Sequence, residues 1–104
     1  MEANYPPPTK ETVLREIEKF SDVIKGYSVR RIGVFGSVVR GEANAESDID
    51  LLVEFSEKTL DNYFGLKFFL EDLFGKKVDL VIAENVKPRL RPIIFSEVEY
   101  AAGF

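Results

Sequence analysis

Three aspartates within two apolar segments are the residues of this chain whose type and spacing could do chemistry. Asp48 and Asp50 begin the run DIDLLVEF, and Asp79 stands inside KVDLVI. A buried carboxylate is costly unless it is paired or coordinated, and two carboxylates about 4 Å apart repel by roughly 4 kcal/mol at an effective dielectric near 20. A divalent cation relieves this conflict, and Mg²⁺ is commonly held by one or two carboxylates together with substrate phosphates. The aspartates therefore point to a magnesium site.

A glycine-serine pair ahead of the aspartates supplies groups that suit a phosphate. Gly36 and Ser37 directly follow the apolar run VRRIGVF. Glycine at such a turn lets the backbone approach a phosphate, the following N–H groups can donate to it, and Ser37 adds a hydroxyl. Taken with the carboxylates, this turn indicates phosphoryl or nucleotidyl transfer, in which the protein positions the reactants and metal ions stabilise the developing charge.

Each of these residues also has a purely structural explanation, which the sequence leaves open. Asp48 and Asp50 fit solvated strand positions, Gly36 and Ser37 fit an ordinary turn and cap, and Asp79 fits an ion pair with a neighbouring lysine, Lys76 or Lys77. Arg40 suits a salt bridge to Glu42 or Glu46 as well as a phosphate contact. Five basic residues between positions 76 and 91 are either a patch that steers a triphosphate or solvated surface; they are Lys76, Lys77, Lys87, Arg89 and Arg91.

The first half of the chain must position the turn and the first two aspartates. Thr9 is placed to cap one amphipathic helix that continues through Phe20 and Ile24 and ends at Gly26. Residues 29–35 predict a strand, 38–40 a short helical turn closed by Gly41, and 42–47 a loop. Residues 48–55 predict a second strand, whose period of two puts Asp48 and Asp50 on the same face.

The second half must position the third aspartate. Residues 59–74 predict a helix that ends at Gly75, and residues 77–82 predict a third strand. The four phenylalanines on that helix fit the core or a partner-binding face, and they are Phe64, Phe68, Phe69 and Phe74. Pro88 suits the first turn of a further helix that Pro92 would interrupt or kink, and residues 97–104 suit a final strand or an irregular tail.

This order of elements predicts the α/β (α+β) class, with a small mixed sheet covered by helices mainly on one face. Residues 1–104 suit one domain, and residues 1–8, with prolines 6 to 8, are expected to form a flexible, extended lead-in.

Composition excludes several classes of function. The chain has no histidine and no cysteine, which rules out histidine-based catalysis, disulfides and thiolate or histidine zinc sites within it. Its net charge of −4 argues against a duplex nucleic acid partner. Neither a long apolar run nor a signal peptide is visible, so we expect a cytoplasmic protein without a membrane partner.

The ordered set GSVVRG, SDIDLLV and KVDLV resembles the minimal nucleotidyltransferases of the DNA polymerase β-like superfamily, from about residue 29 to about residue 91. That resemblance implies the polymerase β-like core. It also implies that Gly36 and Ser37 hold the triphosphate, that Asp48 and Asp50 bind two Mg²⁺ ions, and that Asp79 completes the metal site. Either Asp79 or a bound water takes the proton of the acceptor hydroxyl. Arg40 and Gly41 match the turn that follows the Gly-Ser pair in that family.

The same resemblance implies a donor and a partner. Larger members of the superfamily carry a separate acceptor-binding domain, for which 104 residues leave no room, so we expect the acceptor to come from another chain. Minimal members are commonly antitoxins of small helical toxins of the HEPN class, to which some attach AMP from ATP at a tyrosine. Two alternatives remain: an antitoxin that neutralises its partner by binding alone, and a transferase that modifies a small molecule such as an antibiotic. Homo- or hetero-oligomerisation stays open.

Overall fold

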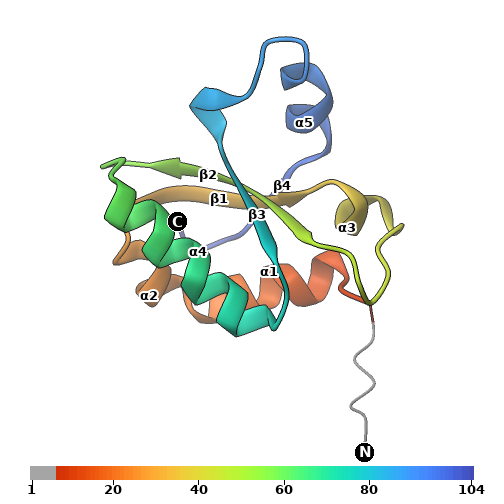
Figure 1. Cartoon of the computed structure of the whole chain (residues 1–104), viewed down its shortest axis with the longest axis horizontal. Helices are drawn as coiled ribbons and strands as arrows, with labels where there is room; N and C mark the ends of the chain where they lie inside the picture. The colour runs from red at the N-terminus through yellow and green to blue at the C-terminus, as the bar shows by residue number, and fades with distance from the viewer. Residues whose placement is uncertain (1–6) are drawn as a thin grey trace, which may run out of the picture.

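A four-stranded mixed sheet organises the part of the chain that the structure, a computed structural model, describes, which is residues 7–104. Its strands are β1 (Val29–Phe35), β2 (Ile49–Phe55), β3 (Val78–Ile82) and β4 (Glu99–Tyr100), in the order β3-β2-β1-β4 (Figure 1). Strand β1 is antiparallel to β2 and to β4, whereas β2 and β3 are parallel. The expected α/β class with a small mixed sheet is confirmed. The predicted lead-in lies, for residues 1–6, outside the described residues.

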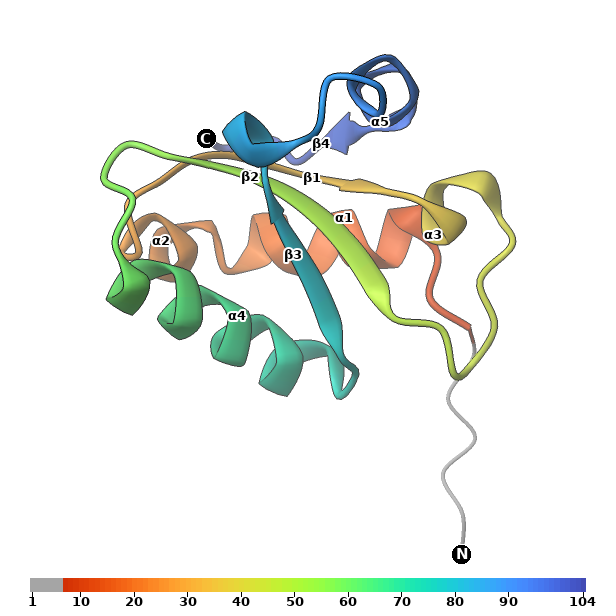
Figure 2. The same cartoon turned by 45° about the horizontal axis from the view of Figure 1, so that its top comes forward.

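One face of this sheet carries the main core. Helices α1 (Lys10–Lys19), α2 (Ser21–Lys25) and α4 (Leu60–Phe74) lie together on that face (Figures 1 and 2). Alternate strand residues point toward them, because side chains along a strand alternate between faces; the buried ones include Ile32, Val34, Ile49, Leu51, Val53, Val78 and Leu80. Helical coverage mainly on one face was expected and is confirmed.

The opposite face carries a smaller apolar cluster and the three aspartates. Phe35 and Leu52 pack there with Ala83 of the 3₁₀ turn η1 (Ala83–Asn85) and with Ile94 of α5 (Arg91–Glu97). Asp50 shares this face, because it alternates with Leu51 along β2. Two of the aspartates on this face, Asp48 and Asp79, are exposed, and Asp50 is half-buried.

Three of the predicted helix boundaries coincide with capping residues. Thr9 caps α1 in a reciprocal capping box with Thr12, as the sequence suggested for Thr9. Helix α4 begins after Thr59, whose side chain accepts a hydrogen bond from the Asn62 N–H, and ends at Gly75 in a left-handed conformation. Across residues 7–104, no helix is long and apolar enough to cross a membrane.

Two predictions about helices are wrong. The single helix expected from Thr9 to Gly26 is broken at Phe20, which has φ −105° and ψ 24° and separates α1 from α2. The Phe20 ring packs edge-on against the Phe69 ring of α4, with 5.9 Å between the ring centroids, so tertiary packing overrides the helical period. Helix α5 begins at Arg91 instead of near Pro88, and Pro92 lies in its first turn, where the missing N–H of proline costs nothing.

Candidate functional site

The pairing of β2 with β3 brings two of the predicted aspartates side by side. Asp50 and Asp79 are direct partners in the parallel register of these strands. Registered partners point to the same face of a sheet, so both carboxylates lie on the face opposite α1, α2 and α4. Asp48 immediately precedes β2 and is exposed, as is Asp79, whereas Asp50 is half-buried. Strand pairing therefore gathers the three aspartates at one end of the sheet.

Gly36 lies directly beside Asp50, the half-buried member of this group. Strands β1 and β2 pair Phe35 with Asp50, so the turn after β1 begins beside the Asp50 carboxylate. Gly36 has φ 75° and ψ −148°, and a Cβ added there would lie 3.0 Å from the Asp50 Cγ and overlap its Oδ2 atom. Only glycine fits this position, because the backbone is left-handed and the carboxylate occupies the space of a side chain.

Burial and neighbouring charges raise the pKa of Asp50 from 3.8 to about 6. Desolvation by burial is the largest cause, followed by Coulomb repulsion from Asp79 and then from Asp48, whereas Arg40 lowers the pKa of Asp50. The same carboxylate is thus partly dehydrated and faces two like charges. Such a group gains more than an ordinary surface aspartate from a nearby cation.

The carboxylates do not form a ready-made metal cluster. Within residues 7–104, no group of three or more acidic side chains is gathered closely enough to hold a metal ion as the side chains stand. The chemistry of the set nevertheless fits magnesium, because Asp48, Asp50 and Asp79 offer only hard oxygen donors, and the repulsion at Asp50 is the conflict that a cation would relieve. Binding an ion here requires these side chains to converge.

Ser37 and Arg40 are the first and last residues of α3 (Ser37–Arg40), the short helix that follows Gly36. Arg40 donates from Nε to Glu42 Oε1 at 2.9 Å, which is the salt bridge that the sequence allowed as an alternative to a phosphate contact. It also donates from Nη1 to both carboxylate oxygens of Glu97, at 3.1 and 3.2 Å. The hydrogen bond to Glu42, which is the largest cause, and the hydrogen bond to Glu97 raise the pKa of Arg40.

Glu97 is the residue at this site that sequence reasoning missed. It ends α5, and its Oε1 atom accepts a hydrogen bond of 2.9 Å from the Gly36 N–H. Sixty-one residues separate the two partners, and nothing in FSEVEY marks this glutamate. The position of Glu97 beside the turn depends on β4, which pairs with β1 at Gly33 and Val34 and so brings the end of α5 to this place.

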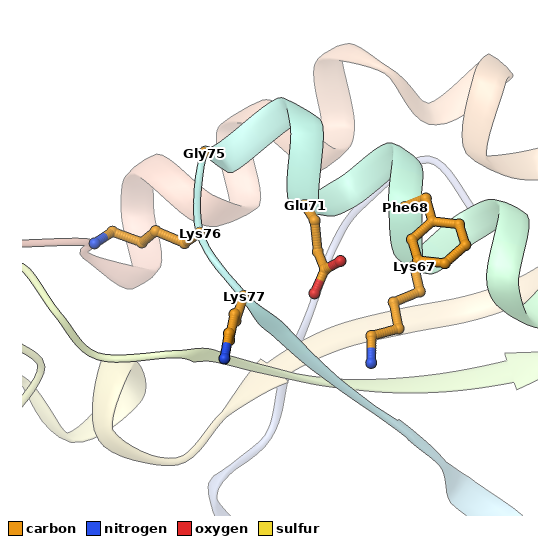
Figure 3. Close-up of a pocket in the computed structure, with 6 residues that line it drawn as sticks. All are labelled: Lys67, Phe68, Glu71, Gly75, Lys76 and Lys77. Atoms are coloured by element: carbon orange, nitrogen blue, oxygen red, sulfur yellow. The ribbon is translucent and has the colours of Figure 1, made fainter.

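The lysines beside Asp79 have other neighbours. Among the described residues no ion pair involves Asp79, and Lys76 donates to the Ala45 carbonyl instead. Lys76 and Lys77 lie at an open depression of about 570 Å³ at the end of α4 (Figure 3). Glu71 also lines this depression, and its Oε2 atom accepts the Val78 N–H at 3.0 Å. Glu71 thus satisfies an N–H of edge strand β3. The ion pair weighed for Asp79 is not formed.

Comparison with known proteins identifies the family. The family model described as nucleotidyltransferase domain matches residues 13–101. MntA, a protein adenylyltransferase of Thermococcus cleftensis, is 41% identical over 93 residues, which are 84% of this chain and 94% of that protein. The implied enzyme class, nucleotidyltransferase, is confirmed.

Solved structures give the same result for the fold. One described as a minimal nucleotidyltransferase is 40% identical, with a TM-score of 0.76 over 88% of this chain and 94% of that one. The complex of a tri-AMPylated Shewanella oneidensis HEPN toxin with its MNT antitoxin is 18% identical, with a TM-score of 0.64 over 92% of this chain and 74% of that one, and it shares the fold alone. With its Gly-Ser turn beside the paired aspartates, the chain belongs to the nucleotidyltransferase domain family.

Proposed function

We propose that this protein transfers AMP from ATP to a hydroxyl of a protein partner, a tyrosine of a helical HEPN-class toxin, and thereby acts as its antitoxin. The observation that carries the proposal is the register of Asp50 with Asp79 beside Gly36. It puts the groups suited to metal ions and those suited to phosphate within one end of the sheet, where Asp48 and Asp79 are exposed.

Each residue of the site has a distinct role in this reaction. The Gly36 and Ser37 backbone and the Ser37 hydroxyl hold the triphosphate, with Arg40 as a further phosphate contact. Asp48, Asp50 and Asp79 would hold two Mg²⁺ ions, which supply charge stabilisation when bound. The acceptor oxygen bonds to the α-phosphorus, the bond from that phosphorus to the bridging oxygen of pyrophosphate breaks, and the exposed Asp79 accepts the acceptor proton.

The nature of the acceptor is supported by relatives. MntA of Thermococcus cleftensis, which this chain matches over nearly its full length, is a protein adenylyltransferase. The more distant Shewanella oneidensis MNT antitoxin is in complex with a HEPN toxin that carries three AMP groups. A protein acceptor therefore has more support than a small-molecule acceptor.

Intact-mass spectrometry tests the proposal. The chain is mixed with a candidate partner, a helical HEPN-class protein, together with ATP and Mg²⁺, and we expect the partner to gain one or more AMP units. Asp48→Ala and Asp50→Ala should abolish the gain. Asp22→Asn removes an exposed carboxylate from α2, outside the site and not on α4, and is the matched control that should retain it. If the partner stays unmodified although the wild-type protein is shown to be folded, the transferase role is contradicted.

Neutralisation by binding alone is a second candidate, because α4 presents an apolar surface to solvent. Leu60, Phe64 and Phe68 are 76%, 45% and 58% exposed, and the rings of Phe64 and Phe68 stack at 6.0 Å. Phe69 and Phe74 of the same helix pack against the core. Two of the four phenylalanines thus belong to the core, and the other two are available to a partner. If an Asp48→Asn variant still protects cells from the partner, contact and not AMP transfer is the antitoxin activity.

A further inference from the structure

Glu97 occupies the groups that the proposed function assigns to phosphate. Its carboxylate accepts the Gly36 N–H at 2.9 Å and contacts Arg40 Nη1 through both oxygens. The Glu97 side chain is only 18% exposed. A carboxylate and a phosphate are both delocalised anions that accept charge-assisted hydrogen bonds from guanidinium and backbone N–H groups. Glu97 therefore makes contacts of the kind expected for a phosphate.

We infer that Glu97 is an affinity-determining residue of the nucleotide site: its carboxylate holds the anion position at Gly36 and Arg40, and ATP must displace it to bind there. This inference rests on the proposed function, because it concerns the same turn. Gly36 is a buried residue, so its N–H gains from having an acceptor at all times. Glu97 supplies that acceptor in the free protein, and a phosphate oxygen supplies it in the complex.

The exchange requires only the Glu97 side chain to move. The backbone that follows it is anchored, because β4 pairs with β1 and the Ala101 N–H donates to the Ile32 carbonyl at 2.9 Å. Gly33 lets this segment approach closely: a Cβ there would lie 2.7 Å from the Glu99 carbonyl oxygen. A rotation of the Glu97 side chain releases the Gly36 N–H and frees one side of Arg40, while Glu42 still holds the Arg40 Nε.

Charge opposes simultaneous occupancy. Glu97 already contributes to the repulsion felt by Asp50, so a triphosphate arriving with Glu97 in place would meet one more anion in a site that holds three aspartates. Like charges placed together disfavour binding. A Glu97 that stayed fixed would instead act as a positioning residue for Arg40, and the two roles predict opposite effects of removing its charge.

Binding of Mg²⁺-ATP and Mg²⁺-tripolyphosphate, measured by titration calorimetry, separates these roles. We expect Glu97→Gln and Glu97→Ala to bind both ligands about tenfold more tightly than wild type, about 1.4 kcal/mol. Glu42→Gln is the matched control: it removes the other carboxylate on Arg40 and leaves the Gly36 N–H contact, so its affinity should stay within about twofold of wild type.

The remaining outcomes are also decisive. Unchanged or weaker binding by both Glu97 variants, with wild type still binding ATP, overturns the inference and leaves the proposed function standing. Equal tightening in Glu42→Gln shows a general charge effect and overturns it as well. If neither wild type nor the Glu97 variants bind ATP, the proposed function itself fails. The Gly36 amide resonance reports the contact without activity: Glu97→Ala should shift it, and ATP should shift it in wild type.

Discussion

The carboxylate of Asp50 occupies the space beside the Cα of Gly36 that the side chain of any other residue would fill. The turn associated with phosphate and the aspartate associated with metal are therefore in van der Waals contact before any ligand binds. Since Gly36 is in a left-handed conformation and Asp50 is held by strand pairing, a side chain added at Gly36 would have to displace the Asp50 carboxylate.

Gly36→Ala should disable the site and lower stability. The added Cβ overlaps the Asp50 carboxylate and forces a backbone conformation that alanine avoids, so we expect a loss of about 2 kcal/mol in the free energy of unfolding together with loss of AMP transfer. Gly41→Ala is the matched control, because Gly41 is also left-handed, with φ 72°, but a Cβ there meets nothing within 4 Å. It should cost about 1 kcal/mol and keep activity. Urea denaturation and the mass assay measure both, and equal behaviour of the two variants would contradict the contact.

The raised pKa of Asp50 predicts a pH-dependent effect of Asp50→Asn in the metal-free protein. Because the pKa rises from 3.8 to about 6 on folding, this group favours the folded state below about pH 4, and that contribution is lost as the pH rises through 6. At pH 8 the variant should therefore be more stable than wild type, by on the order of 1 kcal/mol, since solvent screens a half-buried group. At pH 4 the difference should shrink. Urea denaturation at both pH values checks this; a variant less stable at pH 8 would contradict it.

Asp79→Asn should lower the pKa of Asp50. Asp79 is the largest charge-based cause of the Asp50 shift, because the parallel register makes the two residues direct partners. Burial remains in the variant, so the pKa of Asp50 should move toward its ordinary value without reaching it. A ¹³C titration of the Asp50 carboxyl measures this. Asp72→Asn, on α4, should leave the pKa of Asp50 unchanged. If Asp79→Asn also leaves it unchanged, the two carboxylates do not interact and the prediction is wrong.

Much of this site follows from the sequence, because its determinants are local. A period of two puts Asp48 and Asp50 on one face, and an apolar run places Asp79 in a further strand. What the sequence could not give depends on contacts between distant segments. The break at Phe20 arises from its packing on Phe69, and the role of Glu97 arises from the two-residue strand β4. Such a short strand carries no period of its own, so its pairing with β1 has no local signature.

Mg²⁺ should stabilise the folded protein, and more strongly at pH 8 than at pH 5. A cation at Asp48, Asp50 and Asp79 binds only the folded state and requires ionised carboxylates; with a pKa of about 6 for Asp50, protonation competes with the ion at pH 5. Thermal denaturation with and without Mg²⁺ tests this, with chelation by EDTA expected to reverse the gain. Asp48→Asn combined with Asp50→Asn should abolish it. A gain that survives in this double variant would place the ion elsewhere.

Gly33→Ala should loosen the end of α5 from the site. A Cβ at Gly33 would lie 2.7 Å from the Glu99 carbonyl oxygen and 2.8 Å from Val98 Cγ2, so β4 must move outward, and Glu97 moves with it. We expect a loss of about 1–3 kcal/mol in the free energy of unfolding, as for overpacking in general, and a shifted Gly36 amide resonance, because that N–H loses its carboxylate partner. Gly75→Ala, where a Cβ meets nothing within 4 Å, should leave the Gly36 amide unchanged. A Gly33→Ala protein with an unaltered Gly36 resonance would show that Glu97 reaches the turn independently of β4.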